Sequence, residues 1–346
     1  MDTIATASSS DRRDLFTETA NRRALSPIII EKDFWVCWTL KQATSLESIG
    51  PNLIFKGGTS LSKVFGLIQR FSEDIDLSIQ RSYLGFAGEA DPEKATSRTK
   101  QREQVLSLRD ACRECVRTVV LPALSARFDS ILGPEGWNLT LDEVDANTLN
   151  FVYPAAAPTR RARGARSWLP LAYIRPEVRL ELGAGSDPYP VGDYPIRSYA
   201  AEAFPQAFSD AECSVTALEA ERTFWEKATL VHAEYHRAAD KPTPARISRH
   251  YYDLHQLAWS EQGRRAVADR ELLRRVAEHK QVYFASGWAH YETAAAGGIH
   301  LIPPDTRLKE LAQDYDLMRD MFFGPFPKIE EILTRLQELE REINAQ

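Results

Sequence analysis

Two aspartates separated by one residue are the first feature of this sequence that could do chemistry. Asp74 and Asp76 flank Ile75, and in an extended strand the side chains at positions i and i+2 point to the same face. Two carboxylates held together in this way can bind one or two Mg²⁺ ions against a triphosphate. A solvated strand face is the alternative interpretation, and it accounts for most acidic pairs with this spacing.

A glycine turn lies one predicted helix before the aspartates. A short apolar strand at 52–56 leads into Gly57-Gly58-Thr59-Ser60, where a helix with apolar periodicity begins. Free backbone N–H groups and the helix dipole at such a position favour phosphate, and glycine lets phosphate approach the main chain. The spacing is not that of a P-loop, and most turns of this kind use glycine for backbone geometry alone. The turn therefore indicates phosphate binding only in combination with the aspartates that follow it.

The strands that would carry these groups can be predicted from alternation. Phe71 begins a strand in which Ile75, Leu77 and Ile79 alternate with the acids. Further strands are predicted at 139–141, 148–153 and 177–182, and the last alternates strictly. Glu181 on that strand could supply a third carboxylate to the same metals, with Glu177 as the fallback.

The remaining segments are predicted to be mainly helical. Residues 10–48 form helices with a break at Ser26-Pro27, and 89–128 form a long helical region. The Pro-rich stretch 187–205 is predicted as an exposed connection. Beyond it, helices are predicted at 217–237, 248–259, 264–285, 306–321 and 328–343. We therefore expect an α+β protein with two domains, 1–205 and 206–346, and a cleft between them.

Composition excludes several classes of protein. The 346 residues carry 43 basic and 49 acidic side chains, a net charge of -6, which argues against a uniformly basic surface that coats nucleic acid. No apolar run reaches the roughly 18 residues of a membrane span, and the start from Met1 to Ser10 lacks signal-peptide features. We expect a cytoplasmic protein without a membrane partner.

Two motifs together resemble a known family. The run Phe55-Lys56-Gly57-Gly58-Thr59-Ser60-Leu61-Ser62-Lys63, followed by Arg70-Phe71-Ser72-Glu73-Asp74-Ile75-Asp76-Leu77, resembles the AbiEii/AbiGii and MenT-type nucleotidyltransferase toxins of the DNA polymerase β-like superfamily. Glu226-Lys227 and Tyr252-Asp253-Leu254 resemble the family's downstream lysine and aspartate motifs. The resemblance touches residues from about 30 to 340.

The resemblance implies a fold and a set of functional residues. The fold is a polymerase β-like nucleotidyltransferase domain with a small mixed sheet, followed by a C-terminal helical bundle. Asp74 and Asp76, with Glu181, would bind the metals, Lys227 would neutralise the triphosphate, and Asp253 matches the second essential acid. The nucleotide-binding set would comprise Lys56, Gly57, Gly58, Thr59, Ser60, Lys63, Ser72 and Lys227. Arg249-His250 stands where family members often have Arg-Asp, so the role of His250 stays open.

The function implied by the resemblance is transfer of an NMP from an NTP to an acceptor. Mg²⁺ or Mn²⁺ would be the cofactor, the tRNA 3′ end or another RNA the acceptor, and an antitoxin encoded by the adjacent gene the partner of this toxin. Modification of a protein or small molecule is one alternative, and an inactive nucleotide-binding regulator is another. The intact Asp74 and Asp76 argue against the inactive regulator.

Other polar groups have weaker functional interpretations. The arginine-rich loop 160–166, with Arg237, Lys241, Arg246 and Arg249, could contact RNA phosphates, although a solvated turn explains the loop equally simply. Cys112 with Cys115, and His232 with His236, have spacings seen in zinc sites, yet the cysteines have no second pair nearby and no Glu follows His232 as an HExxH motif requires. We therefore predict no structural zinc, and we expect the histidines to lie on a helix face near the substrate channel.

Overall fold

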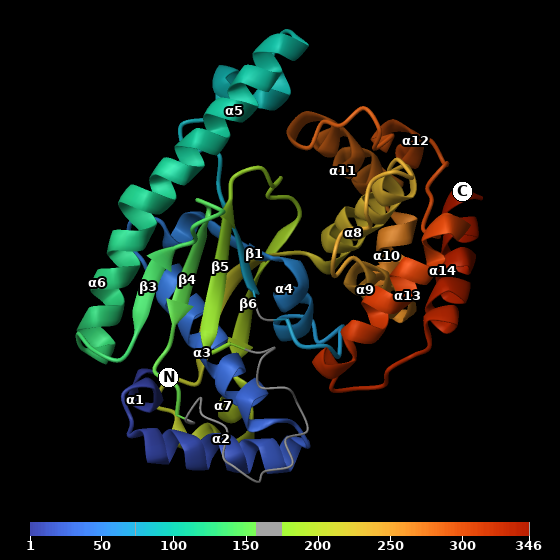
Figure 1. Ribbon diagram of the computed structural model, residues 1–346. Helices are drawn as coiled ribbons and strands as arrows, with labels where there is room; N and C mark the ends of the chain where they lie inside the picture. The colour runs from blue at the N-terminus through green and yellow to red at the C-terminus, as the bar shows by residue number, and fades with distance from the viewer. Residues whose placement is uncertain (73, 157–174, 346) are drawn as a thin grey trace.

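The computed structural model describes residues 1–72, 74–156 and 175–345. Within these ranges a seven-stranded mixed sheet forms one half of the molecule and helices form the other (Figure 1). β2 pairs with β5, and β1 with β7, in parallel, whereas the other neighbouring strands are antiparallel. The spatial order is β3 (Asn138–Leu141), β4 (Thr148–Val152), β5 (Glu177–Gly183), β2 (Asp74–Ile79), β1 (Leu53–Lys56), β7 (Glu212–Leu218) and β6 (Val191–Arg197). This arrangement confirms the predicted α+β class.

The N-terminal helices α1 (Asp2–Ala5), α2 (Ser9–Arg23) and α3 (Pro27–Thr44) support the sheet, together with α7 (Tyr199–Ala203). The Ser26 side chain accepts from the N–H of Ile28, and Pro27 opens α3, so the predicted helix break is confirmed. α3 is apolar around most of its circumference, as a helix buried on all sides must be. Trp35 and Trp38 from this helix pack on Phe151 of β4.

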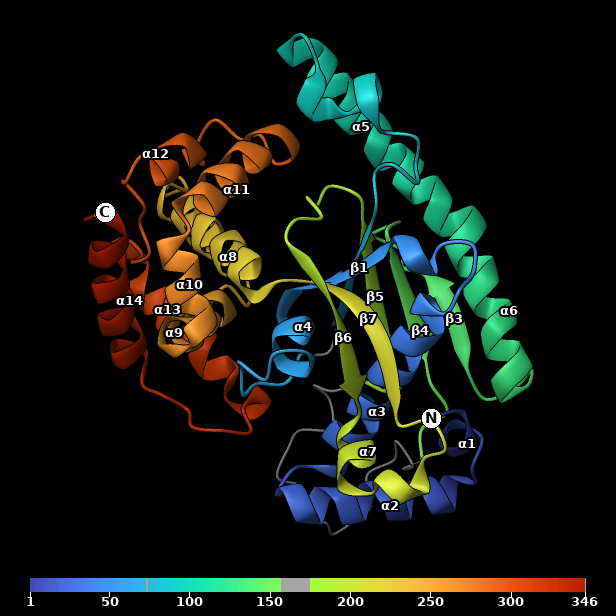
Figure 2. The same cartoon turned by 180° about the vertical axis from the view of Figure 1, so that it is seen from behind.

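A long helical rod covers the β3–β4 end of the sheet. α5 (Arg98–Cys115) runs through a π-helical turn at Val116–Val120 into α6 (Leu121–Leu132). Phe128 anchors α6 in the aromatic core against Trp38 and Phe151. The N-terminal part of α5 extends past the sheet, and Figures 1 and 2 show it standing opposite α11.

The helical half has its own apolar core, which the short helix α4 (Gly57–Lys63) reaches through Leu61. Arg70 and Phe322 form an isolated β-bridge between the two halves. No helix in the described ranges has the length and apolar content needed to cross a bilayer. The helices of this half are α8 (Ala220–Tyr235), α9 (Ser248–Trp259), α10 (Glu261–Ala268), α11 (Arg270–Tyr283), α12 (Tyr291–Ala295), α13 (Leu308–Leu317) and α14 (Ile329–Asn344).

Two strands depart from the sequence prediction. The stretch 187–205, predicted as an exposed connection, contains the edge strand β6, and Pro195 is accommodated there because an edge strand has N–H positions that need no partner. β7 follows at Glu212–Leu218 and pairs with β1 inside the sheet. The sheet therefore continues past the predicted boundary at residue 205, to Leu218.

Candidate active site

The carboxylates meet at the centre of the sheet. In the parallel pair β2–β5, Asp76 lies directly beside Glu181, and Asp74 lies two residues earlier on the same strand. All three line a cavity of about 320 Å³ between the sheet and α8, α9 and α11, which we call the cleft. The fallback Glu177 lies at the start of β5 and does not line it.

The crowding of these acids has an electrostatic consequence. Burial, followed by the negative charges of Asp76 and Asp74, raises the pKa of Glu181 to about 7. Arg179, on the same strand, lies 3.7 Å from Glu181 and opposes this shift only in part. Among the described residues no three His, Cys, Asp or Glu side chains are arranged to hold a metal ion. The three acids therefore concentrate negative charge on this face of the sheet, and Arg179 opposes it only in part.

The glycine turn presses the backbone against these acids. Lys56 pairs with Asp76 across β1 and β2, and Gly57 follows with a φ of +82°. A Cβ on Gly57 would lie 2.0 Å from Oδ2 of Asp76, and one on Gly58 would lie 2.9 Å from Oγ of Ser72. Lys56, both glycines and Ser72 line the cleft. Space as well as backbone geometry thus requires glycine at the turn.

Three residues of the predicted nucleotide-binding set have side chains that make structural contacts and do not line the cleft. The Thr59 hydroxyl donates to the carbonyl of Asp74 (2.5 Å) and the Ser60 hydroxyl to that of Gly57 (2.9 Å), which fastens the turn to β2. Lys63 points away from the cleft and pairs with the buried Asp33 at 2.7 Å. Although burial opposes its charge, Asp33 raises the pKa of Lys63 above its ordinary value. Lys63 therefore serves the packing of α4 on α3.

Lys227 and Asp253 meet in a buried three-residue network with Arg70. Arg70 donates to both oxygens of Asp253, each at 2.7 Å, and Nζ of Lys227 lies 2.8 Å from Oδ2. Asp253 is 0% exposed, and burial alone would raise its pKa, but Arg70 and Lys227 hold it well below the ordinary value. Arg70 and Lys227 line the cleft, whereas Asp253 lies behind them and fixes their positions.

The structure gives His250 a position beside this network. Its Nδ1 lies 3.5 Å from Nζ of Lys227. Burial and the positive charges of Lys227 and Arg249 hold the pKa of His250 well below its ordinary value, so the ring is neutral. A neutral ring can accept a hydrogen bond from the Lys227 ammonium without adding charge to the cleft.

Sequence reasoning missed Lys280, which enters the cleft from α11. Its Nζ donates to the carbonyl of Glu226 at 2.8 Å. Burial, with the nearby charges of Arg222 and Lys56, lowers the pKa of Lys280 to about 8. No spacing in the sequence marks this lysine, because its neighbours come from α8 and β1. Local spacing does indicate one contact near Lys280, because Arg222 lies one turn before Glu226 on α8 and the two side chains can pair.

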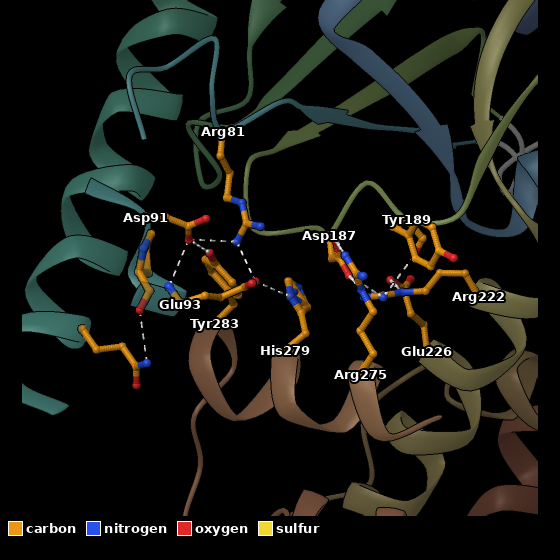
Figure 3. Close-up of polar contacts among 12 residues, drawn as sticks. Arg81, Asp91, Glu93, Asp187, Tyr189, Arg222, Glu226, Arg275, His279 and Tyr283 are labelled. Atoms are coloured by element: carbon orange, nitrogen blue, oxygen red, sulfur yellow. Dashed lines mark hydrogen bonds and ion pairs between the residues drawn. The ribbon is translucent and has the colours of Figure 1, made fainter. Parts of the chain in front are cut away.

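A polar network at the back of the cleft joins the β5–β6 connection to two helices (Figure 3). Asp187 accepts from Arg222 of α8 at 2.9 Å and from Arg275 of α11 at 2.6 Å and 2.9 Å. Arg222 also bonds Glu226 at 3.2 Å and the carbonyl of Tyr189 at 3.3 Å. These contacts hold α8 and α11 at a fixed distance from the sheet.

The same network continues toward the segment before α5 (Figure 3). The Tyr283 hydroxyl donates to Asp91 at 3.3 Å, and Arg81 donates to Glu93 at 2.9 Å. His279 lies between the two groups, with Nδ1 3.6 Å from Glu93. Burial, with Arg222 nearby, lowers the pKa of His279 to about 3, so this histidine is neutral. The C-terminal end of α11 is thereby tied to residues 81–93.

The other predicted polar groups fall outside the cleft, except one. Arg249 lines it, while Arg237 pairs with Glu234 and Lys241 with Asp240. The arginines of 160–166 lie outside the described residues. His232 and His236 form a ring cluster with His290 and His300, and none of the four lines the cleft. Cys112 and Cys115 are buried free thiols.

Comparison with known proteins identifies the family that the motifs indicate. The family model described as nucleotidyl transferase AbiEii toxin, type IV toxin–antitoxin system, matches residues 38–335. No curated protein sequence matches the chain. Among solved structures, MenT4, a nucleotidyltransferase toxin from Mycobacterium tuberculosis H37Rv, is similar with a TM-score of 0.40 and 14% identity, over 96% of this chain and 98% of that one. Because the family match spans most of its length, this chain belongs to the AbiEii family of nucleotidyltransferases, the toxins of type IV toxin–antitoxin systems.

Proposed function

We propose that this enzyme transfers a nucleoside monophosphate from an NTP to the 3′ hydroxyl of a tRNA, with Mg²⁺ or Mn²⁺ as the cofactor. The observation that carries the proposal is one cleft with three carboxylates on its sheet side and cationic side chains on its helical side. An NTP bound to a divalent ion has both kinds of charge and so fits both walls.

The carboxylates fit a divalent ion that arrives with the nucleotide. Magnesium is usually bound through one or two protein carboxylates together with substrate phosphates and water. Asp74 and Asp76 would supply the protein ligands, and Glu181 stands beside Asp76 to add a third. When bound, the ion would neutralise phosphate charge and lower the pKa of the attacking hydroxyl.

Several side chains are placed to bind the triphosphate. Gly57 and Gly58 allow phosphate oxygens to reach the backbone, and Lys56 and Ser72 flank them. Lys227 and Lys280 present ammonium groups from the opposite wall. Asp253 acts as a positioning residue, because its two salt bridges hold Lys227 and Arg70 at the cleft surface. Thr59 and Ser60 can contribute their backbone N–H groups only.

The reaction would be an in-line displacement. The acceptor oxygen bonds to the α-phosphorus, the bond from that phosphorus to the bridging oxygen of the β-phosphate breaks, and pyrophosphate leaves. The hydroxyl proton passes to water or to a carboxylate oxygen at the strand edge. Lys227 and Lys280 stabilise the negative charge that develops on the leaving group.

A labelling experiment tests the proposal. The purified protein is incubated with total RNA and each α-labelled NTP in turn, with Mg²⁺, with Mn²⁺ or with a chelator. We expect label on RNA of tRNA size, loss of label with the chelator, and loss of label in the Asp76→Asn variant. Label confined to protein or to a small molecule would contradict the RNA acceptor and support the alternative acceptors.

The family assignment implies a cognate antitoxin, which we propose is encoded by the adjacent gene. A tRNA acceptor also implies that the reaction takes place in the cytoplasm. Co-expression with the product of the neighbouring gene should restore growth in cells that the toxin arrests. Continued arrest in the presence of that product would exclude it as the antitoxin.

A further inference from the structure

A second cavity reaches the same carboxylates from another side. It has a volume of about 410 Å³ and lies between β5 and the middle of α5. Lys56, Asp76, Glu181 and Phe284 line both this cavity and the cleft. The glycine turn and Lys227 line the cleft alone. The carboxylates therefore stand at a junction, with the nucleotide-binding groups on one side and a separate approach on the other.

The second cavity continues outward into a groove. This groove, of about 860 Å³, lies between α5 and the α11–α12 segment, and it shares Val105, Arg109 and Tyr283 with the second cavity. Figures 1 and 2 show the free end of α5 opposite α11 in both views. Arg109 donates to the carbonyl of Tyr283 at 2.8 Å, and the Tyr283 hydroxyl donates to Asp91 (Figure 3). These bonds fix the two walls of the path relative to each other.

The α5 wall of this path is a row of exposed cations. Arg98, Arg102, Arg109 and Arg113 all line it. Within the described part of the chain, neither Arg98 nor Arg102 has a carboxylate within 4.0 Å. Arg109 donates to the carbonyl of Tyr283, and Arg113 pairs with Asp110 at 3.1 Å. Arg98 and Arg102 therefore differ from most exposed arginines of the described residues, which are paired with acids, in a protein with a net charge of -6. Cations without local partners are available to a polyanion.

An exposed aromatic ring marks the inner end of the path. Phe284, directly after α11, is 52% exposed and lies where the cleft and the second cavity meet. Rings of this kind stack on unpaired bases, and proteins that bind single strands combine them with a cationic track. The row from Arg98 to Arg113 spans fifteen residues of helix, about 22 Å, which matches roughly six stacked nucleotides.

We propose that this path binds the single-stranded end of an RNA acceptor, with its phosphates on the α5 arginines, and brings its terminal hydroxyl to Asp76 and Glu181 from the side opposite the NTP. The inference rests on the proposed function, since it assigns a surface to the acceptor of that reaction. A protein acceptor would not need a cationic helix face, with Arg98 and Arg102 free of acidic partners, that ends at a stacking ring. The row therefore favours RNA.

Two triple variants with equal charge change test the assignment. The groove variant carries Arg98→Ala, Arg102→Ala and Arg113→Ala, while Arg109 is kept because it holds Tyr283. The control variant carries Arg117→Ala, Arg197→Ala and Arg319→Ala, three exposed arginines that do not line the path. Affinity for a labelled tRNA acceptor-arm oligonucleotide is measured against salt concentration, together with the Kd for NTP and the KM for RNA.

We expect the groove variant to bind RNA at least 10-fold more weakly and to lose about 2 from the slope of log affinity against log salt, since each single-strand phosphate contact contributes about 0.7. The Kd for NTP should stay within about 2-fold in both variants, and the control should bind RNA like the wild type. Photocrosslinking of 4-thiouridine RNA to the unaltered protein should map to 98–113 or 283–291.

The outcomes separate this inference from the proposed function. If the unaltered enzyme labels RNA but the groove variant keeps its RNA affinity and salt slope, the surface is assigned wrongly while the function stands. Crosslinks to α13 or α14 would overturn it in the same way. If the unaltered enzyme labels no RNA, the proposed function itself fails, and the acceptor path fails with it.

Discussion

Replacing Lys280 with methionine should make the protein more stable and less active. Methionine keeps the unbranched apolar stem of lysine and removes the ammonium group, which is buried near the Glu226 carboxylate and near the cations Arg222, Lys56 and Lys227. The structure places this ammonium in the cleft, where its charge disfavours folding but would favour a bound triphosphate. The two effects of the substitution therefore have opposite signs.

The magnitude follows from the pKa. A fall from 10.5 to about 8 corresponds to about 3 kcal/mol by which the folded state disfavours the charged lysine. The lost hydrogen bond to the Glu226 carbonyl offsets about 1 kcal/mol, so a gain of about 2 kcal/mol in unfolding free energy is expected at pH 7. Loss of one charge-assisted phosphate contact should weaken NTP binding about 10- to 100-fold.

The pH dependence of stability and of activity provides a second test of the role of Lys280. Because the folded-state pKa is lowered, the unfolded chain retains a proton between about pH 8 and 10.5 that the folded chain has lost. Lys280 therefore adds a rise in the stability of the unaltered protein through this window, and the Lys280→Met variant should lack that contribution. In the unaltered enzyme, kcat/KM for NTP should fall as the pH rises through about 8.

Urea unfolding from pH 7 to 10.5 and titration with a fluorescent NTP analogue are the assays. Lys309→Met, at an exposed position on α13, is the matched control and should change neither quantity appreciably. A decrease in unfolding free energy for Lys280→Met, or an unchanged Kd for NTP, would refute the reasoning.

Two further pairs of substitutions test the geometry of the cleft. Asp253→Asn should lower the free energy of unfolding by about 3 to 5 kcal/mol at pH 7, because it leaves buried Arg70 and Lys227 without their anion. Lys227→Ala should lower it less, because Asp253 keeps its bidentate bond to Arg70. Equal losses in urea unfolding would be inconsistent with the network. Since the pKa of Asp253 is depressed, its stabilising contribution should be present above pH 3.8 and disappear as the pH falls further. Gly57→Ala should abolish transfer and lower the free energy of unfolding by about 1 to 3 kcal/mol, because its Cβ would lie 2.0 Å from Oδ2 of Asp76. The control Gly66→Ala, at a φ of +63° with nothing within 4 Å, should keep activity. Equal transfer rates of the two variants would show that the turn is not pressed against the acid.

Local pattern was sufficient to predict several parts of the site from the sequence. The period of two in a strand places Asp74 and Asp76 on one face, and the break at Ser26-Pro27 follows from capping chemistry that involves only neighbouring residues. Local pattern did not predict β6 and β7, because their proline and polar residues are not typical of strands. These edge and near-edge strands are stabilised by their pairing partners.

The tertiary structure decided which groups meet. Glu181 stands beside Asp76 only because β2 and β5 pair in parallel across about a hundred residues of chain, and no local pattern specifies that partner. The directions of Lys63, toward Asp33, and of Lys280, into the cleft, likewise depend on helices that are distant in sequence. Their pKa values depend on the same packing, because burial and neighbouring charge exist only in the folded chain. Sequence determined which residues could do chemistry, and the non-local pairing of strands and helices determined which of them face one another across the cleft.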